Sequence, residues 1–283
     1  ELNCGPVDYS PIVIQEPEAI EIDESSIVIT HVSCFGEDDG AISITAHGGT
    51  GDLYYTITMG GVPVDGFTTQ VNDGTFSPLA PGTYVIEVND DNNCGPVFSD
   101  ELTVLEPNPI TIDLDITHAL CHGDDGSFTA MANEGTAPYT YTLKDSNDDT
   151  YNILTGDADE WVLFDNVNVG TYTLIVEDAN GCQASEVIEI VQPDEIIITL
   201  LTTESPICHP DGTSTLGIIE VEAEGGVSPY IYTLYRDGIY LMENDHGLFD
   251  ELFAGDYYVE VMDANGCGPV ATPLVQLQSP STL

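Results

Sequence analysis

Cysteines and aspartates are the residues of this 283-residue chain whose types and spacing could do chemistry. An opening motif, Cys34-Phe-Gly-Glu-Asp-Asp-Gly40, returns as Cys121-His-Gly-Asp-Asp-Gly126 and, shortened, as Cys208-His-Pro-Asp-Gly212. In a closing motif, a Gly-x-Tyr sequence is followed by an aspartate and then, at a constant distance from the glycine, by a cysteine: Cys94, Cys182 or Cys267. Thiols at regular spacing can form disulfides, and carboxylates gathered in loops can bind Ca²⁺.

Eight aspartates recur beside these cysteines. Five follow the opening cysteines, namely Asp38, Asp39, Asp124, Asp125 and Asp211, and three precede the closing cysteines, namely Asp90, Asp178 and Asp263. They are candidate Ca²⁺ ligands, although their spacing does not match an EF-hand loop. Asp-Gly and Asp-Ala-Asn-Gly are equally common turn sequences, in which the carboxylate accepts hydrogen bonds from its own backbone. Both interpretations stay open, and no cofactor other than Ca²⁺ is expected.

The repeat predicts how the cysteines pair. We expect one disulfide inside each repeat, closing a loop of about 60 residues worth roughly 4 kcal/mol in the chain-entropy model; the expected pairs are Cys34–Cys94, Cys121–Cys182 and Cys208–Cys267. Cys4 lies in a copy of the Cys94 sequence, so we expect it to pair with a cysteine upstream of residue 1. Regular spacing without Cys-x-x-Cys favours disulfides in an oxidising compartment over a zinc site, with reduced, buried cysteines as the alternative.

The charge of the chain excludes several classes of partner. Fifty acidic residues face only two basic ones, Lys144 and Arg236, for a formal net charge of −48. Nothing here could neutralise phosphates, which excludes nucleic acid and anionic membrane surfaces. The acidity is interpreted either as a solvated surface that keeps a long chain extended by self-repulsion, or as divalent-cation binding.

An enzyme is not expected from this sequence. It contains no Walker A motif, no Gly-x-Gly-x-x-Gly after a strand and no His-Glu-x-x-His. A nucleophilic triad would need a unique site, whereas the cysteines here belong to the repeat. Carboxylates are so numerous that no pair of them stands out as catalytic.

Internal repetition defines the domains. The opening cysteines stand at equal intervals along the chain, at positions 34, 121 and 208, and a proline marks each junction. We expect repeats over 18–107, 108–193 and 194–280, preceded by the end of another repeat over 1–17 and followed by the start of the next linker over 281–283. No apolar run is long enough to span a membrane, so a membrane anchor or export signal is expected outside this stretch.

The hydrophobic pattern predicts an all-β fold. Apolar residues alternate with period two, as in Ala41–Ala46 and Tyr84–Val88, and no segment has a helical stripe. The Leu-x-x-Gly-x-Tyr sequence resembles the tyrosine corner of Greek-key sandwiches, with Tyr84, Tyr172 and Tyr257 as the corner residues. We therefore expect tandem immunoglobulin-like β-sandwiches, each closed by one disulfide. Trp161, at the start of an apolar run, is expected in a core.

These motifs together resemble the SprB repeat of Bacteroidetes surface proteins. The resemblance rests on Cys-x-Gly-x-x-Asp-Gly, then Gly-Gly-x-x-x-Tyr-x-Tyr, then a Leu-x-x-Gly-x-Tyr motif that ends in Asp-Ala-Asn-Gly-Cys, as at Asp178–Cys182 and Asp263–Cys267. The first repeat departs from it with Asp-Asp-Asn-Asn before Cys94, and the third with Pro210 in place of glycine.

The resemblance implies a section of a very large, secreted, cell-surface adhesin. Such adhesins are exported by the type IX system, and some of them serve gliding motility. We expect an extracellular stalk or filament that acts as a mechanical spacer. Alternatively, the repeats themselves bind Ca²⁺ and carbohydrate or neighbouring filaments, or they form an extracellular fibre or lattice. The expected partners are neighbouring repeats of the same chain, extracellular polysaccharide and other filaments.

Overall fold

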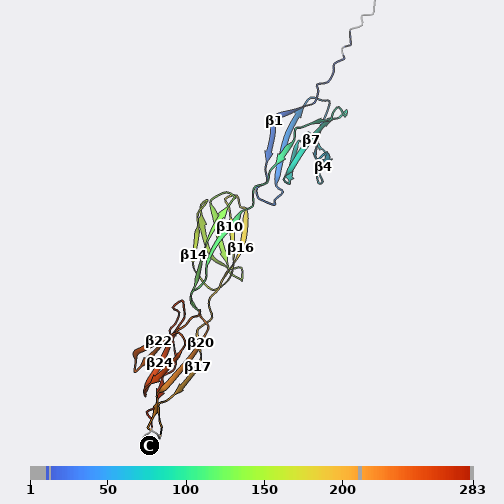
Figure 1. The fold of residues 1–283 in the computed structure, drawn as a ribbon. Helices are drawn as coiled ribbons and strands as arrows, with labels where there is room; N and C mark the ends of the chain where they lie inside the picture. The colour runs from blue at the N-terminus through green and yellow to red at the C-terminus, as the bar shows by residue number, and fades with distance from the viewer. Residues whose placement is uncertain (1–10, 13, 210–211, 281–283) are drawn as a thin grey trace, which may run out of the picture. The chain divides into compact units, whose positions relative to one another are not determined.

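The computed structural model describes residues 11–12, 14–209 and 212–280; Cys4 and Asp211 lie outside these ranges. Contacts group the chain into two compact units. One comprises the chain to Ile110 with Glu134–Thr136 and Glu177–Cys182, and the other comprises Thr111–Asn133, Ala137–Val176 and the chain from Gln183. The described residues contain strands and no α-helix (Figure 1). They therefore include no helix long and apolar enough to cross a membrane.

The first repeat folds into two antiparallel sheets. One has the order β1-β2-β6, formed by β1 (Glu21–Thr30), β2 (Gly40–His47) and β6 (Thr75–Leu79). The other pairs β3 (Leu53–Met59) with β7 (Gly82–Asp90), flanked by β4 (Val62–Pro63), β5 (Gln70–Val71), β8 (Val97–Phe98) and β9 (Leu102–Val104). The chain changes sheet between β2 and β3, between β5 and β6, and again between β6 and β7. This is the Greek-key order of an immunoglobulin-like sandwich.

The second repeat has the same strand order. Its sheets are β10-β11-β14 and β13-β12-β15-β16, with β10 (Thr111–Thr117), β11 (Gly126–Asn133), β12 (Tyr139–Lys144), β13 (Thr150–Gly156), β14 (Val162–Val167), β15 (Gly170–Glu177) and β16 (Gln183–Ile190).

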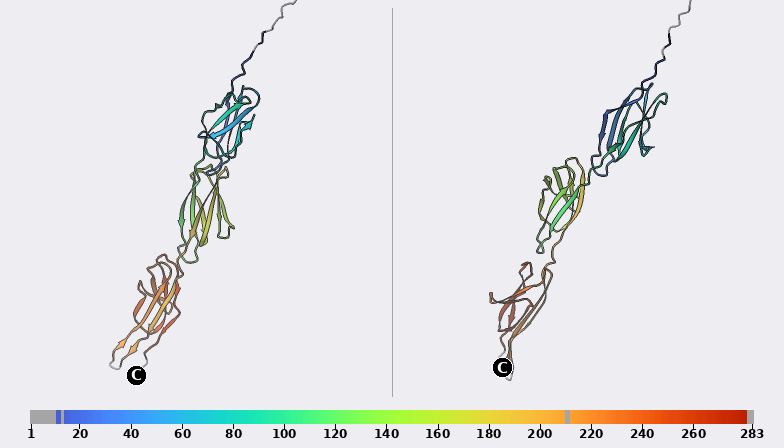
Figure 2. Two further views of the ribbon diagram at one scale, coloured as in Figure 1. Left: turned by 90° about the vertical axis from the view of Figure 1, so that its right-hand side faces the viewer. Right: turned by 45° about the horizontal axis from the view of Figure 1, so that its top comes forward.

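The third repeat follows the same plan (Figure 2). One sheet is β17-β20-β23, formed by β17 (Ile197–Glu204), β20 (Gly217–Glu224) and β23 (Leu248–Leu252). The other joins β21 (Ile231–Arg236), β22 (Ile239–Asn244), β24 (Gly255–Met262), β25 (Val270–Ala271) and β26 (Val275–Leu277). Two short strands, β18 (Ile207–Cys208) and β19 (Ser214–Thr215), pair with each other in a separate sheet.

Alternation along the strands builds each core. In β7, the side chains of Tyr84, Ile86 and Val88 are buried, whereas the residues between them are only half-buried. In β6, Phe76 and Leu79 cover the same core. The all-β, immunoglobulin-like fold expected from period two is therefore confirmed. Trp161 was wrongly expected in a core: it is 48% exposed, and its neighbour Val162 is the buried residue.

The three corner tyrosines make the same hydrogen bond. Each hydroxyl donates to the carbonyl oxygen four residues earlier, at 2.8, 2.9 and 2.8 Å for Tyr84–Ala80, Tyr172–Asn168 and Tyr257–Phe253. Burial raises the pKa of each phenol, so the hydroxyl stays protonated and able to donate. Each tyrosine thereby ties its strand to the arch that precedes it.

Tyr257→Phe is expected to lower the free energy of unfolding of the third repeat by about 1–2 kcal/mol, because the Phe253 carbonyl loses its donor. Thermal unfolding measures this change. The matched control is Tyr258→Phe, which keeps the ring that stacks on Tyr235 at 4.7 Å and should cost under about 0.5 kcal/mol. Equal effects of the two substitutions would contradict a structural role for the corner hydroxyl.

Candidate functional site

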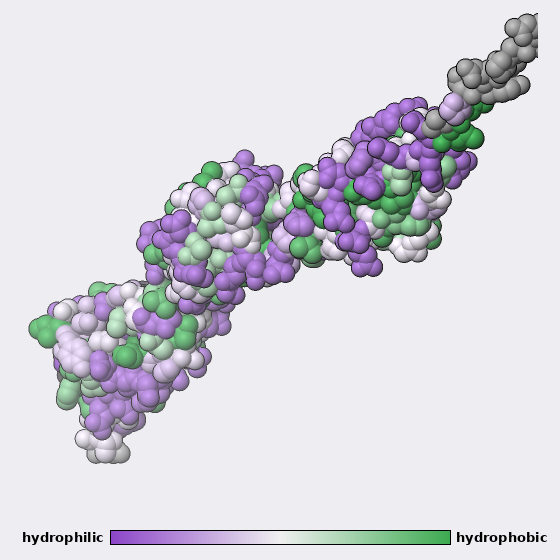
Figure 3. Space-filling model, turned by 90° about the horizontal axis from the view of Figure 1, so that it is seen from above, coloured by the Kyte–Doolittle hydropathy of each residue, from purple (hydrophilic) through white to green (hydrophobic). Residues whose placement is uncertain are grey.

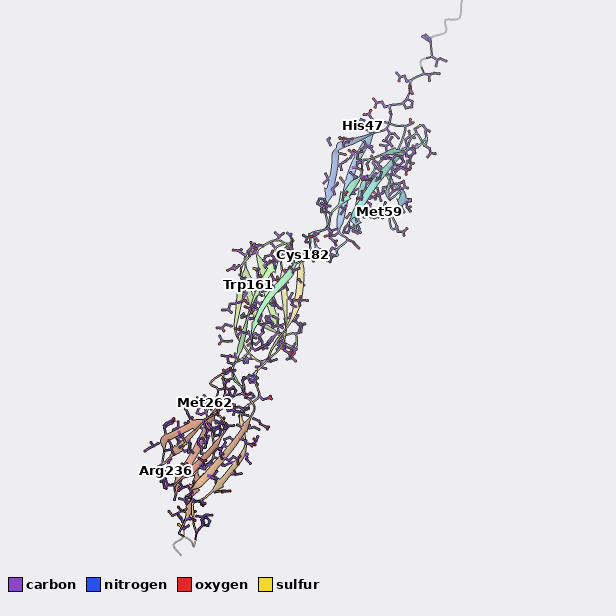
Figure 4. The ribbon with its side chains drawn as sticks, viewed as in Figure 1. His47, Met59, Trp161, Cys182, Arg236 and Met262 are labelled. Atoms are coloured by element: carbon purple, nitrogen blue, oxygen red, sulfur yellow. A yellow bond between two sulfur atoms is a disulfide. The ribbon has the colours of Figure 1, made fainter. Side chains whose placement is uncertain are left out.

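The cysteines form disulfides between successive repeats. Cys34 bonds to Cys182 and Cys121 bonds to Cys267, with Cα–Cα distances of 5.4 and 5.5 Å (Figure 4 labels Cys182). Cys94 and Cys208 are free and exposed. The expected pairs Cys34–Cys94, Cys121–Cys182 and Cys208–Cys267 are therefore wrong, and so is the expectation that each sandwich is closed by its own disulfide.

Strand direction explains the error. Cys34 precedes the start of β2, which lies against the last strand, β9. The two are so close there that a Cβ added to Gly40 would be 2.6 Å from the Val104 side chain. Cys94 follows the end of β7, and this end lies beside the other end of β2. A Cβ added to Gly49, just after β2, would be 3.1 Å from Asp90, the last residue of β7. The whole of β2, roughly 25 Å long, separates these two positions, whereas a disulfide needs Cα atoms within about 7 Å. We call the end of a repeat near its last strand the C-terminal pole, and the end where the chain enters it the N-terminal pole.

The opening cysteine turn is fixed at the C-terminal pole. In the first repeat, Gly36 donates its backbone N–H to Glu106 Oε1 at 2.7 Å, and Leu105 donates to His31 Nδ1 at 3.1 Å. The second repeat repeats both bonds, Gly123 to Gln192 at 2.7 Å and Val191 to His118 at 3.4 Å. The glycine of Cys-x-Gly adopts a φ of +83° and +86° in these two turns, which favours glycine.

Sequence reasoning missed the side chains that hold this turn. His31 and His118 each lie three residues before an opening cysteine, and Glu106 and Gln192 each precede a junction proline. These regular offsets are the signal that could have found them. Their position next to the outgoing chain means that the opening cysteine faces the start of the following repeat.

The closing cysteine is positioned by the aspartate four residues before it. One oxygen of Asp263 accepts the backbone N–H groups of Asn265 and Cys267 at 2.9 and 2.8 Å, and the other accepts that of Val227 at 2.9 Å. Asp178 accepts the equivalent three bonds at 2.8–2.9 Å. Asp90 does so at 2.8–3.0 Å. These aspartates are only 2–6% exposed, and their negative charge is satisfied by backbone donors.

At each bridge, the closing sulfur lies against the backbone that precedes the opening cysteine. Cys182 Sγ is 3.3 Å from the Ser33 carbonyl oxygen, and Cys267 Sγ is 3.3 Å from that of Leu120. Asn265 adds a hydrogen bond from its side-chain amide to the Leu120 carbonyl at 3.0 Å. A turn at the C-terminal pole of one repeat is therefore seated on the N-terminal pole of the next.

The aspartates proposed as Ca²⁺ ligands divide into two groups. Asp90, Asp178 and Asp263 are buried turn residues, whereas Asp38, Asp39, Asp124 and Asp125 are exposed. The Asp39 carboxylate accepts the Ser33 backbone N–H at 2.8 Å. Hydrogen bonding to the Ser33 side chain, followed by this backbone bond, lowers the pKa of Asp39. Within the described ranges, no three or more His, Cys, Asp or Glu residues form a group that could hold a metal ion. Calcium binding stays a prediction.

Acid is expected to weaken the first repeat through Asp90. The Cys94 N–H, followed by those of Thr50 and Asn92, lowers the pKa of this carboxyl below its ordinary 3.8. Because the folded-state pKa is depressed, the stabilisation is present above about pH 4 and is lost as the pH falls through the folded value. Asp90→Asn should lower the melting temperature by several degrees at pH 7, with a smaller deficit near pH 2. The control Asp65→Asn alters an exposed carboxylate; a constant deficit for Asp90→Asn would refute the linkage.

Comparison with known proteins identifies the repeat. Residues 26–62, from within β1 to the start of β4, match the family model of the SprB repeat. This chain contains a SprB repeat. The resemblance seen in the sequence is thereby confirmed, and the opening cysteines of the other two repeats follow at equal intervals, Cys121 with the same Cys-x-Gly sequence. SprB repeats are associated with the cell surface, so the match over residues 26–62 supports a cell-surface, adhesin-like repeat protein.

Similarity to solved structures is weak. Three N-terminal domains of the highly immunogenic outer capsid protein of bacteriophage RB49 are 13% identical, with a TM-score of 0.39, over 92% of this chain and 94% of that one. Eight N-terminal immunoglobulin domains of Down syndrome cell adhesion molecule are 14% identical, with a TM-score of 0.30, over 92% and 41%. Curated proteins yield no match. The fold class therefore rests on strand order.

Proposed function

We propose that this chain is a stalk section of a large filamentous adhesin at the cell surface, acting as a mechanical spacer. The observation behind this proposal is that each disulfide joins two successive SprB-type repeats. Each junction between repeats is therefore crossed by two covalent connections, the backbone and a cystine. This arrangement suits a chain that transmits force, including the force of surface attachment or gliding.

The surface chemistry supports an extracellular spacer. Acidic residues outnumber basic ones by 50 to two, and hydrophilic residues cover much of the face shown in Figure 3. Like charge opposes collapse of the chain and association between filaments. Cystines require an oxidising compartment, which agrees with export, by the type IX route that the resemblance implies. In this proposal the chain has no catalytic role, and its partners are the neighbouring repeats.

A surface-binding experiment separates the spacer from a binding module. The fluorescently labelled chain is applied to immobilised acidic and neutral polysaccharides and to glass, either with Ca²⁺ at about 2 mM, which would fill even a weak extracellular site, or with EDTA. A spacer should show no saturable binding in either condition. Saturable binding that requires Ca²⁺ would overturn the proposal in favour of repeats that bind carbohydrate through their acidic loops.

A further inference from the structure

The N-terminal pole of the first repeat contains an unused copy of the cystine site. The Cys94 backbone N–H donates to Asp90 at 2.8 Å, as Cys267 donates to Asp263 at 2.8 Å. Above each turn, a glycine N–H donates to the chain that enters the repeat: Gly49 to Glu18 at 2.9 Å and Gly226 to Asp194 at 2.7 Å. These two hydrogen bonds of the site are therefore already formed around Cys94, although its thiol is free.

A cavity marks the place that the partner turn would fill. Beside Cys267, a cavity of about 170 Å³ is lined by the N-terminal pole of the third repeat and by Cys121 and His122 of the second. Beside Cys94, the equivalent cavity measures about 350 Å³ and is lined by residues 16–20, Gly49, Asp90, Cys94, Gly95 and Val97, all from one pole. No cysteine turn of another repeat lines the larger cavity, whereas Cys121 and His122 line the smaller one.

We infer that the Cys94 pole is a docking site for the opening-cysteine turn of a further SprB-type repeat, to which Cys94 becomes disulfide-bonded. The occupant is a Cys-x-Gly turn, because that turn occupies the equivalent site beside Cys267. In the bonding step the two thiols lose two protons and two electrons to an exchanging disulfide, which is reduced to two thiols. This inference rests on the proposed stalk and deepens it by naming the partner of Cys94.

A thiol-exchange experiment tests the docking site in the full chain. Cys4→Ser and Cys208→Ser leave Cys94 as the reactive thiol. The probe is a peptide with the sequence of residues 118–126, its cysteine activated as a 2-pyridyl disulfide; Cys94 attacks the peptide sulfur, and 2-thiopyridone leaves. We expect this peptide to react at least about tenfold faster than a scrambled peptide with the cysteine at the same position, a preference of about 1.4 kcal/mol.

Two substitutions at Ala19, an exposed residue that lines the cavity, sharpen the test. Ala19→Trp should abolish the preference for the native peptide while leaving the reaction of Cys94 with 2,2′-dipyridyl disulfide unchanged. Ala19→Glu introduces the residue found at the equivalent position, Glu195, beside the occupied site, and should keep the preference. Equal rates for the native and scrambled peptides would overturn the docking site and leave the stalk itself untouched.

With Cys94 and Cys208 both present, a disulfide between two copies is a further outcome. The Cys4→Ser chain, with no other substitution, is oxidised with and without added peptide, and dimers are detected by non-reducing electrophoresis. If added native peptide did not suppress a Cys94–Cys208 dimer, the peptide and the second copy would not compete for one site. That result would overturn the docking site. Suppression by native but not by scrambled peptide would support it.

Discussion

Pulled from points before Cys34 and beyond Cys267, the oxidised chain should extend between these cysteines to roughly 200 Å, against roughly 800 Å after reduction. The two disulfide loops overlap, since Cys121 lies inside the 34–182 loop. The shortest covalent path therefore runs from Cys34 across to Cys182, back along the backbone to Cys121 and across to Cys267. Without the cystines the path is the whole backbone from Cys34 to Cys267, which is nearly four times as long.

Single-molecule force spectroscopy measures these lengths directly. Removing one bridge with Cys121→Ser and Cys267→Ser should leave a path that crosses from Cys34 to Cys182 and then follows the backbone to position 267, roughly 290 Å in all. Cys94→Ser, which removes a free thiol, is the matched control and should leave the oxidised length unchanged. If the oxidised chain extended as far as the reduced one, the bridges would not be formed, and the mechanical role of the cystines would be lost.

Digestion with trypsin should leave the oxidised chain in one piece. Its only two basic residues, Lys144 and Arg236, define three fragments, 1–144, 145–236 and 237–283. Cys34–Cys182 links the first fragment to the second, and Cys121–Cys267 links the first to the third. The chain is denatured without reductant, its free thiols are alkylated, and the digest is run with and without reduction. We expect one species without reduction and three with it.

Cysteine variants make this digest diagnostic. Cys34→Ser should release fragment 145–236 without reduction, and Cys121→Ser should release fragment 237–283, because each loses its only bridge. Bridges within the repeats would give a different result, since Cys121–Cys182 and Cys208–Cys267 would keep all three fragments together in Cys34→Ser. Retention of fragment 145–236 in that variant would therefore refute pairing between successive repeats.

Such a linkage has a consequence for a protein exposed to proteases. Every peptide bond between Cys34 and Cys267 lies within at least one disulfide loop, and those from 121 to 182 lie within both. A single cut anywhere in this stretch leaves the two parts covalently joined. Bridges confined to single repeats would leave the junctions between repeats as the points where one cut divides the chain.

Local chemistry could be predicted from the sequence because it depends on near neighbours. Period-two alternation places Tyr84, Ile86 and Val88 on one face of a strand without knowledge of the partner strand. The Leu-x-x-Gly-x-Tyr motif contains both members of the corner hydrogen bond, Ala80 and Tyr84. The two interpretations of Asp90 could also be stated, because nearby backbone donors supply two of its three bonds.

The sequence by itself determined the repeat, the all-β class, the corners and the cysteines as the residues that matter. Only the tertiary structure decided which cysteines meet. Spacing along the chain makes Cys34 and Cys94 look like partners, but strand direction carries them to opposite poles of one sandwich. The pole that a cysteine occupies depends on how many strands the chain completes before reaching it, and short strands such as β4 and β5 are too weakly patterned to count from sequence. Cys34 therefore meets Cys182, at a sequence separation of 148, because both lie where one repeat ends and the next begins.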